Sequence, residues 1–328
     1  MAFPPQRCLI VGPSWVGDMV MAQSLFMALK HRFPDLQIDV LAPAWSKPIL
    51  AAMPEVRAAI EMPLQHGELA LGKRYQLGKS LRANAYDWAI VLPRSLKAAL
   101  VPFWANIPVR TGFKGEMRYG LLNDIRPMDK TVLTMTVQRF VALGLPKDAR
   151  LPPEIQSPRL VVEGTSSSSP ISPTLALCPG AEYGGAKRWP AEYYAAVALH
   201  YTTQGGQVIL LGSAKDAPVT AQISTAVNSP ACQDLAGKTS IQEVLALLAQ
   251  ADQVVSNDSG LMHVAAALGT PVIAVYGSSD PTYTPPLSDK AQILYLGLPC
   301  SPCFKRECPL GHLDCLKKIE PQQVISHL

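Results

Sequence analysis

Short apolar segments alternate with longer helix-forming segments along most of the chain. Strands are predicted where buried-type residues run together, as in Cys8–Gly12, Gln37–Ala42 and Thr174–Cys178. The segments between them have helical length, and Met19–Phe33 is predicted as the first helix. This alternation is typical of an α/β fold in which a parallel sheet is covered by helices on both faces.

Less regular elements follow from the same pattern. Helices are predicted over Thr131–Leu143 and over Leu261–Leu268, where Gly269 and Pro271 end the second of them. The apolar run Ala249–Val255 predicts a short buried strand. Arg159–Val162 is apolar enough to pair as an edge strand.

Prolines and a run of serines interrupt the alternation in the middle of the chain. Proline recurs between residues 146 and 173, where Ser166–Ser169 also lies, and the strand–helix pattern restarts at Thr174. A chain of 328 residues is long enough for two domains. We expect an N-terminal Rossmann-like domain over residues 1–155, a linker over 156–173 and a C-terminal domain over 174–328.

Composition excludes several classes of protein. Hydrophobic residues make up 48% of the chain and charged residues 16%, which is ordinary for a globular protein. No apolar run approaches the roughly 18–20 residues that span a bilayer. The start of the chain leads into a strand without a signal-peptide pattern, so we expect a cytoplasmic protein.

The net charge of +4 is unevenly distributed. Residues 1–150 carry a formal charge of +8 and residues 151–328 a charge of −4. A basic N-terminal half favours an anionic partner there, although scattered solvated charge is the alternative. The chain shows no basic motif interleaved with aromatic residues, which disfavours nucleic acid.

The stretch from Val254 to Gly269 reads as strand, tight turn and helix. Asn257 to Gly260 favour turns and helix caps, so the first N–H groups of the helix point at whatever lies above the strand. Such a helix start is a site for phosphate. Ser259 and His263 lie four residues apart and share one helix face. The alternative is a simple cap with a packed histidine.

Two further turns follow strands in the same half, at Gly180–Lys187 and Gly212–Asp216. Ligands bind at the carboxyl ends of strands in doubly wound sheets. Backbone amides, hydroxyls and the cations Lys187 and Arg188 suit a diphosphate there. Neither a Gly-x-Gly-x-x-Gly run after the first strand nor a P-loop sequence occurs, which disfavours a dehydrogenase or a P-loop enzyme.

In the N-terminal half, Asp18 stands between a glycine-containing loop and a helix. A carboxylate at a helix start is stabilised as the anion. It can act as a general base on a hydroxyl within hydrogen-bond reach, or it can simply cap the helix.

Four cysteines lie close together near the end of the chain, at Cys300, Cys303, Cys308 and Cys315, with His312 between the last two. This clustering indicates a metal knuckle, with structural zinc as the favoured ion, although the spacing is not that of a standard zinc ribbon. Free thiols on a cysteine-rich loop are the alternative. Cys8, Cys178 and Cys232 fall in or near predicted core segments and are expected to be inert.

Cations also flank an apolar run, Leu96–Trp104, in the N-terminal half. Basic residues beside an apolar surface suit an anionic, lipid-bearing acceptor. A core helix with a charged entrance is the alternative. The candidate acceptor-binding residues are Arg94, Lys97, Arg110, Lys114 and Arg118.

Several segments resemble the ADP-heptose:lipopolysaccharide heptosyltransferases of glycosyltransferase family 9. The matching segments, spread from residue 12 to about Pro286, are GPSWVGDMVMAQSL, LAPAW, MPEV, RTGFKGEMRYGLLND, PGAEYGGAKRWP, LGSAKD and NDSGLMHVAAALGTP. The resemblance implies a GT-B fold, with two Rossmann-like domains facing a cleft. It does not extend to the cysteine-rich tail.

The resemblance also implies the reaction. It is the inverting transfer of L-glycero-D-manno-heptose from ADP-heptose to the first heptose of the inner core on Kdo2-lipid A, at the inner face of the cytoplasmic membrane and with no catalytic cofactor. Asp18 matches the base that deprotonates the acceptor hydroxyl, and Lys187 pairs with the diphosphate. Lys215 stands where a related heptosyltransferase has the ribose-contacting glutamate, which is a departure from the family pattern. The expected donor-binding residues are Gly180, Ala181, Lys187, Lys215, Thr239, Asp258, Ser259, Gly260 and His263.

Two other interpretations stay open at this point. One is a family 9 transferase with a different acceptor, because the donor-site residues of such enzymes would barely differ. The other is a nucleotide-binding module without transferase activity. The presence of Asp18 in addition to the anion-binding turns argues against the second, since a binding module needs no base.

Overall fold

The computed structural model describes residues 4–64, 67–162 and 172–328. The chain falls into two compact units, residues 1–160 and residues 161–328. Half of the predicted linker, residues 163–171 with the serine run, lies outside the described residues.

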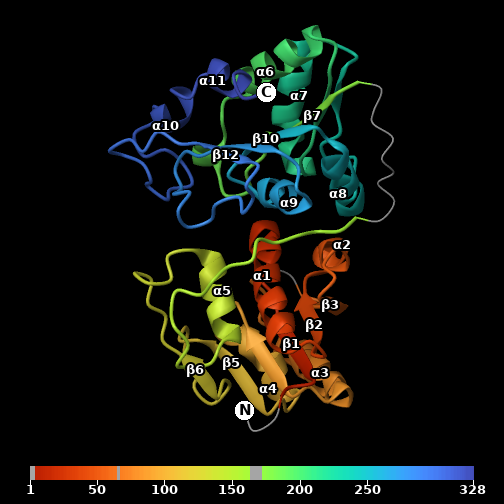
Figure 1. Cartoon of the computed structure of the whole chain (residues 1–328), viewed down its shortest axis with the longest axis vertical. Helices are drawn as coiled ribbons and strands as arrows, with labels where there is room; N and C mark the ends of the chain where they lie inside the picture. Colours follow the sequence, from red (N-terminus) through yellow and green to blue (C-terminus); the bar gives the residue numbers. More distant parts are fainter. Residues whose placement is uncertain (1–3, 65–66, 163–171) are drawn as a thin grey trace. The chain divides into compact units, whose positions relative to one another are not determined.

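Unit 1 is built on a six-stranded parallel sheet with the order β3-β2-β1-β4-β5-β6 (Figure 1). Its strands are β1 (Arg7–Val11), β2 (Gln37–Ala42), β3 (Val56–Glu61), β4 (Trp88–Val91), β5 (Val109–Phe113) and β6 (Asp124–Arg126). Its helices are α1 (Val16–Arg32), α2 (Lys47–Ala51), α3 (Leu71–Leu81), α4 (Leu100–Trp104) and α5 (Thr136–Gly144), with 3-10 turns η1 (Ala44–Ser46), η2 (Arg82–Asn84) and η3 (Leu96–Ala99).

Unit 2 contains a second six-stranded parallel sheet with the order β12-β11-β10-β7-β8-β9. Its strands are β7 (Thr174–Cys178), β8 (Gln207–Leu210), β9 (Cys232–Asp234), β10 (Gln253–Asn257), β11 (Val272–Val275) and β12 (Ala291–Leu294). Its helices are α6 (Ala191–Thr203), α7 (Ala217–Val227), α8 (Ile241–Gln250), α9 (Gly260–Leu268), α10 (Asp314–Lys317) and α11 (Pro321–Ile325), with 3-10 turns η4 (Gly185–Lys187) and η5 (Ala214–Asp216).

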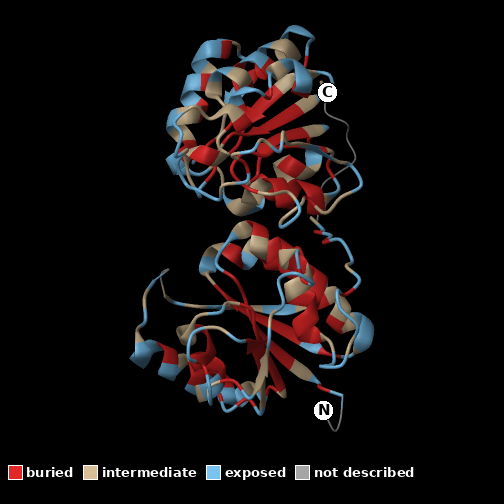
Figure 2. Cartoon of the chain, turned by 90° about the vertical axis from the view of Figure 1, so that its left-hand side faces the viewer, coloured by how far each residue is buried: buried red, intermediate tan, exposed pale blue. Residues whose placement is uncertain are grey.

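Both sheets follow the doubly wound order in which the first strand lies beside the second and the fourth. The predicted fold class, two Rossmann-like parallel-sheet units, is confirmed. In each sheet the central strands are buried on both faces, as the red strands in Figure 2 show. Their continuous apolar sequences reflect this, since helices cover both faces of a parallel sheet.

Local sequence sets where the site-bearing elements begin and end. Helix α9 is apolar on nearly every side and correspondingly buried, and it ends at Gly269 with φ +77°. Helix α8 begins with a capping box in which Ser240 and Glu243 satisfy each other's backbone N–H groups.

The structure corrects three predicted boundaries. Helix α1 begins at Val16, so Asp18 lies inside its first turn. Helix α5 begins at Thr136 and not at Thr131, because the Asp129 carboxylate accepts hydrogen bonds from the N–H and hydroxyl of Thr131 in a turn that competes with helix. Strand β10 begins at Gln253, because α8 continues through Gln250.

The predicted edge strand at Arg159–Val162 is wrong. The segment is irregular, and the Arg159 N–H and carbonyl group bond to the side-chain amide of Gln23 on α1 and not to a neighbouring strand. Among the helices that the structure describes, none is long and apolar enough to cross a membrane.

Candidate functional site

The loops at the carboxyl edge of the unit 2 sheet are held together by Asn257, the last residue of β10. Asn257 is fully buried. Its amide donates to the Pro179 carbonyl oxygen at 2.6 Å, and its side-chain oxygen accepts from the Trp189 N–H and the Tyr194 hydroxyl, both at 3.0 Å. The turn after β10 and the loop after β7 are thereby fixed beside each other.

Lys187 and Asp258 form an ion pair across these two loops. Only 17% of the Lys187 side chain and 5% of the Asp258 side chain are exposed. Asp258 also accepts a hydrogen bond from the hydroxyl of Ser279, in the loop after β11. A carboxylate would repel a diphosphate, so this arrangement suits Asp258 to orient Lys187, whose ammonium has further N–H donors for an anion.

The first turn of α9 adds backbone donors to this cation. Ser259 is the N-cap in extended conformation, and its hydroxyl lies 3.1 Å from the Ser256 hydroxyl without capping the helix. The first N–H groups of Gly260 and its successors are thus left for a ligand. His263 is buried in the same turn, and burial lowers its pKa to about 4, with Lys187 acting in the same direction and Asp258 against it. The imidazole is therefore neutral at pH 7.

The remaining donor candidates lie on neighbouring loops. Gly180 packs so closely on Asp216 that a Cβ at this position would lie 2.5 Å from the Asp216 carboxyl carbon. Ala181, the next residue, is buried. Lys215 is exposed and pairs with Glu182. Thr239, just before α8, places its hydroxyl 3.5 Å from the Leu235 carbonyl oxygen.

The segment between β12 and α10 supports the loop that carries Lys187. The Arg306 carbonyl oxygen accepts from the Ala186 N–H at 2.9 Å, and the Glu307 carboxylate accepts from the Gly185 N–H at 3.2 Å. The Tyr183 hydroxyl donates to the Phe304 carbonyl oxygen at 2.7 Å. The sequence between the clustered cysteines therefore has a structural role beside the site.

The structure gives no support to a zinc site at Cys300, Cys303, Cys308 and Cys315. Within the described residues, no group of three or more His, Cys, Asp or Glu side chains is placed to hold a metal ion. Backbone N–H groups, that of Leu313 above all, lower the pKa of Cys308. Cys8, Cys178 and Cys232 are buried as predicted, and burial raises the pKa of Cys178 to about 12 and of Cys232 to about 11.

In unit 1, a cavity of about 350 Å³ lies at the carboxyl edge of the sheet. Gly12 and Ser14 from the loop after β1, Trp45 and Lys97 are among its lining residues. Asp18 follows the same loop, in the first turn of α1, and is half-buried. Ligands of doubly wound sheets bind at this edge.

Arg74 shapes that cavity from α3, although its side chain is buried. Its guanidinium donates to the backbone carbonyl oxygens of Leu69 at 2.6 Å, Glu68 at 3.0 Å and Lys97 at 3.3 Å. Arg74 thus ties the chain after β3 to the chain after β4.

The five candidate acceptor-binding residues have different surroundings. Arg94 and Lys114 are exposed, and Lys97 lines the cavity. Arg110 donates to the Leu121 carbonyl oxygen at 2.6 Å and stacks over Phe103. Arg118 is only 2% exposed and donates to the Pro93 and Phe113 carbonyl oxygens, so in this structure it positions the loop between β5 and β6 and does not present a charge to solvent.

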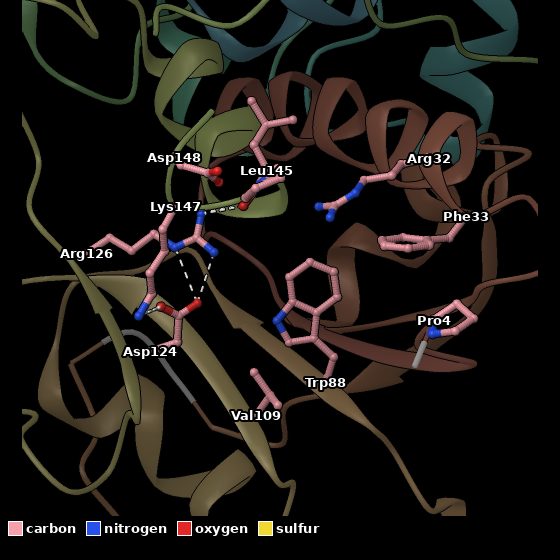
Figure 3. A pocket seen from close by; sticks show the side chains of 11 residues that line it. Pro4, Arg32, Phe33, Trp88, Val109, Asp124, Arg126, Leu145, Lys147 and Asp148 are labelled. Carbon is pink, nitrogen blue, oxygen red and sulfur yellow. Dashed lines mark hydrogen bonds and ion pairs between the residues drawn. The ribbon is translucent and has the colours of Figure 1, made fainter. Parts of the chain in front are cut away.

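A larger cavity, of about 680 Å³, lies at the opposite edge of the same sheet (Figure 3). Trp88 and Val109, the first residues of β4 and β5, line it, as does Arg126. The Arg126 guanidinium pairs with the Asp124 carboxylate at 2.9 Å, as the dashed lines show. Its charge is used within the protein, and this edge of a doubly wound sheet is not where ligands bind.

Sequence reasoning missed residues whose importance depends on partners distant in the chain. Ser279 donates to Asp258 of the ion pair, and Arg74 shapes the unit 1 cavity. Asn257 was expected only as a turn former, but its side chain joins the two loops that carry the pair. The signal for Ser279 was its place in a Gly-Ser-Ser-Asp turn after a strand. Nothing local distinguishes Arg74 from an ordinary surface arginine.

The fold and these loops define a two-unit α/β protein whose second unit presents a cation and uncapped helix amides at the carboxyl edge of its sheet, the edge where doubly wound sheets bind ligands. The family model for glycosyltransferase family 9 (heptosyltransferase) matches residues 74–314. The chain belongs to this family and is therefore a glycosyltransferase.

Close relatives match nearly all or most of the chain. Lipopolysaccharide heptosyltransferase 2 of Salmonella typhimurium is 48% identical, covering 98% of this chain and 97% of the relative. Lipooligosaccharide heptosyltransferase 2 of Haemophilus influenzae is 51% identical over 88% of each chain. The solved structure of Escherichia coli ADP-heptose lps heptosyltransferase II superposes with a TM-score of 0.82 at 43% identity, covering 98% of this chain and 97% of that one.

Proposed function

We propose that the protein transfers L-glycero-D-manno-heptose from ADP-heptose to the first heptose of the lipopolysaccharide inner core, on Kdo2-lipid A. The observation that carries the proposal is the largely buried Lys187–Asp258 pair beside the first turn of α9, in a chain 48% identical to a heptosyltransferase 2 over 98% of its length. A diphosphate needs such a cation and such amides.

In this proposal unit 2 binds ADP-heptose. Lys187 and the N–H groups of Ser259 and Gly260 contact the diphosphate, and neutral His263 contributes an N–H donor and not a charge. As the bond from the heptose to the diphosphate breaks, negative charge grows on the leaving phosphate. Preoriented donors stabilise that charge without reorganising, which is the largest contribution many active sites make. No metal-dependent step is proposed.

Asp18 is proposed as the general base. It removes the proton from the acceptor hydroxyl while the hydroxyl oxygen attacks the anomeric carbon of the heptose and ADP departs. One direct displacement inverts the configuration at that carbon. The location of Asp18 in the first turn of α1 supports this role, because the helix amides keep the carboxylate ionised and able to accept a proton.

Unit 1 is proposed to bind the acceptor. The cavity at the carboxyl edge of its sheet offers Lys97 and the Ser14 hydroxyl. Exposed Arg94 and Lys114 suit the phosphate and carboxylate groups of Kdo2-lipid A. We infer that the enzyme works in the cytoplasm and touches the inner membrane through unit 1, where its lipid-bearing acceptor lies.

ADP release from ADP-heptose tests the proposal. We expect release with Kdo2-lipid A carrying one heptose and none with heptose-free Kdo2-lipid A. Release with the heptose-free acceptor would instead assign the activity that adds the first heptose. If ADP binds but neither acceptor supports release, the transfer proposed here is wrong.

Replacing Asp18 by Asn tests the base. We expect turnover to fall roughly 10²–10⁴-fold, the usual contribution of a positioned base, while the affinity for ADP stays unchanged. Asp35→Asn, at an exposed aspartate in the turn after α1, serves as control and should keep wild-type turnover. Near wild-type turnover in Asp18→Asn would remove Asp18 as the base.

A further inference from the structure

Glu182 and Lys215 form an ion pair between two loops at the carboxyl edge of the unit 2 sheet. The Lys215 ammonium lies 2.5 Å from a Glu182 carboxylate oxygen. The side chains are 73% and 50% exposed. Ion pairs this exposed contribute only about 0–1 kcal/mol to the free energy of unfolding. The pair therefore stabilises the fold little, and we looked to ligand binding for the role of its carboxylate.

The position of this pair in the sheet is that of a ribose site. Strands β7 and β8 are the first and second strands of the doubly wound order. In nucleotide-binding sheets of this order, an acidic side chain at the end of the second strand accepts hydrogen bonds from the ribose hydroxyls. Lys215 and Asp216 stand at that place in this chain.

Asp216 is not available for a ribose. Its side chain is buried, and one carboxylate oxygen accepts from the Ser213 N–H at 2.9 Å and the Ser213 hydroxyl at 2.8 Å, while the other lies 3.9 Å from the Arg188 guanidinium. The same carboxylate packs against Gly180. Asp216 therefore builds the turn, and Lys215 is a cation that cannot accept hydrogen bonds.

Glu182 brings a carboxylate to this place from the neighbouring loop. Its neighbour Tyr183 lies with its ring centre 5.1 Å from the Lys187 ammonium, so the same loop reaches from the phosphate-binding cation to Lys215. A carboxylate repels phosphate but accepts hydrogen bonds from hydroxyls. We infer that Glu182 binds the ribose hydroxyls of the donor nucleotide and that Lys215 holds Glu182 in position.

This inference rests on the proposed function, and titration with nucleotides lacking the heptose tests it separately. Full-length protein is titrated calorimetrically with ADP, 2′-deoxy-ADP and 3′-deoxy-ADP. We expect wild type to bind ADP about tenfold more tightly than at least one deoxy analogue, the scale of a hydrogen bond to a charged group. Glu182→Gln should weaken ADP binding about tenfold and bind ADP and that analogue equally.

Glu61→Gln is the matched control, because Glu61 forms a comparably exposed pair with Lys47 at 2.6 Å in unit 1. It should bind all three nucleotides like wild type. Unchanged ADP affinity in Glu182→Gln would overturn the inference. ADP carries no heptose, so a contact between Glu182 and the heptose could not account for a change in ADP affinity. Failure of wild type to bind ADP would overturn the proposed function itself.

Lys215→Met separates the two roles. We expect it to weaken ADP binding only about two- to threefold and to keep the preference for ADP over the deoxy analogue, because the carboxylate remains. The opposite result would be that Lys215→Met loses the preference for ADP over the deoxy analogue while Glu182→Gln keeps it. Lys215 would then contact the ribose itself, which overturns the assignment.

Discussion

At the scale of single residues, the proposed donor site contains an ion pair between a half-buried lysine and a buried aspartate. Lys187 and Asp258 were both expected from the sequence as donor-binding residues, but the structure gives them different surroundings. Asp258 accepts from Lys187 and Ser279 and is almost inaccessible, whereas Lys187 keeps some exposure. Burial and distant partners cannot be read from a motif, so their division of labour could not be predicted from the sequence.

A double-mutant cycle separates binding from stability at this pair. Lys187→Met should weaken ADP binding by about 10- to 100-fold, since hydrogen bonds to charged groups contribute about 1.5–3 kcal/mol. It should also lower the free energy of unfolding by about 3–5 kcal/mol, because Asp258 is left buried and unpaired. Adding Asp258→Asn should restore most of that stability but not the ADP affinity. Recovery of ADP affinity in the double variant would contradict a direct role for Lys187.

His263 predicts a pH dependence of stability. Burial lowers its pKa to about 4, below the ordinary value, so the unfolded chain takes up a proton that the folded chain does not. The stability due to neutral His263 is complete above the unfolded pKa and is lost as pH falls through about 6.5 toward about 4, at up to roughly 1 kcal/mol per pH unit. His263→Gln should flatten urea-unfolding free energies across this range. An unchanged slope in His263→Gln would refute the assignment. His200→Gln is the control, because His200 is only half-buried and its ring bonds to the Gln204 side chain.

At the scale of elements, the predictions worked where periodicity and caps agree. The strand Thr174–Cys178 matches its prediction, and α9 differs by one residue. Short edge strands such as β6 and β12 were missed, because three or four residues give too little pattern. The start of α5 was wrong, since a side-chain turn at Asp129 competes with helix.

The support of the Lys187 loop by the chain between β12 and α10 leads to a prediction at this scale. Gly184 has φ +151°, and a Cβ there would overlap the Arg306 carbonyl oxygen. Gly184→Ala should therefore displace the loop and weaken ADP binding about tenfold or more, because Lys187 loses its orientation. Gly205→Ala is the control, since Gly205 has φ +88° but open space around it, and it should bind ADP normally. Equal ADP affinity in both variants would mean that the support is not needed for binding.

At the scale of the whole molecule, the two units share one topology but differ in charge and in the chemistry at their sheet edges. The presence of two α/β units was predictable from the sequence, because the alternation of strands and helices stops at a proline-rich stretch and then begins again. The side chains that line each edge come from loops distant in sequence, so the motifs identified the edge but not its full set of residues. Arg118 illustrates this limit: the sequence predicts it at the acceptor site, but in the structure its side chain is buried and donates to the Pro93 and Phe113 carbonyl oxygens.

The basic unit predicts salt-dependent contact with membranes. Between β5 and β6, the side chains of Met117 and Tyr119 are 80% and 64% exposed beside the exposed cation Lys114. Apolar side chains next to cations suit a surface of anionic lipid.

In a sedimentation assay with vesicles of anionic phospholipid, binding should fall when salt rises from about 0.05 M to about 0.5 M, because screening shortens the reach of exposed charges. The double variant Met117→Ser/Tyr119→Ser should bind less at both salt concentrations, whereas Leu199→Ser, which removes an exposed leucine from α6, should bind like wild type. Vesicle binding that responds neither to salt nor to the double variant would show that this loop makes no membrane contact, and the acceptor would then reach the enzyme by another surface.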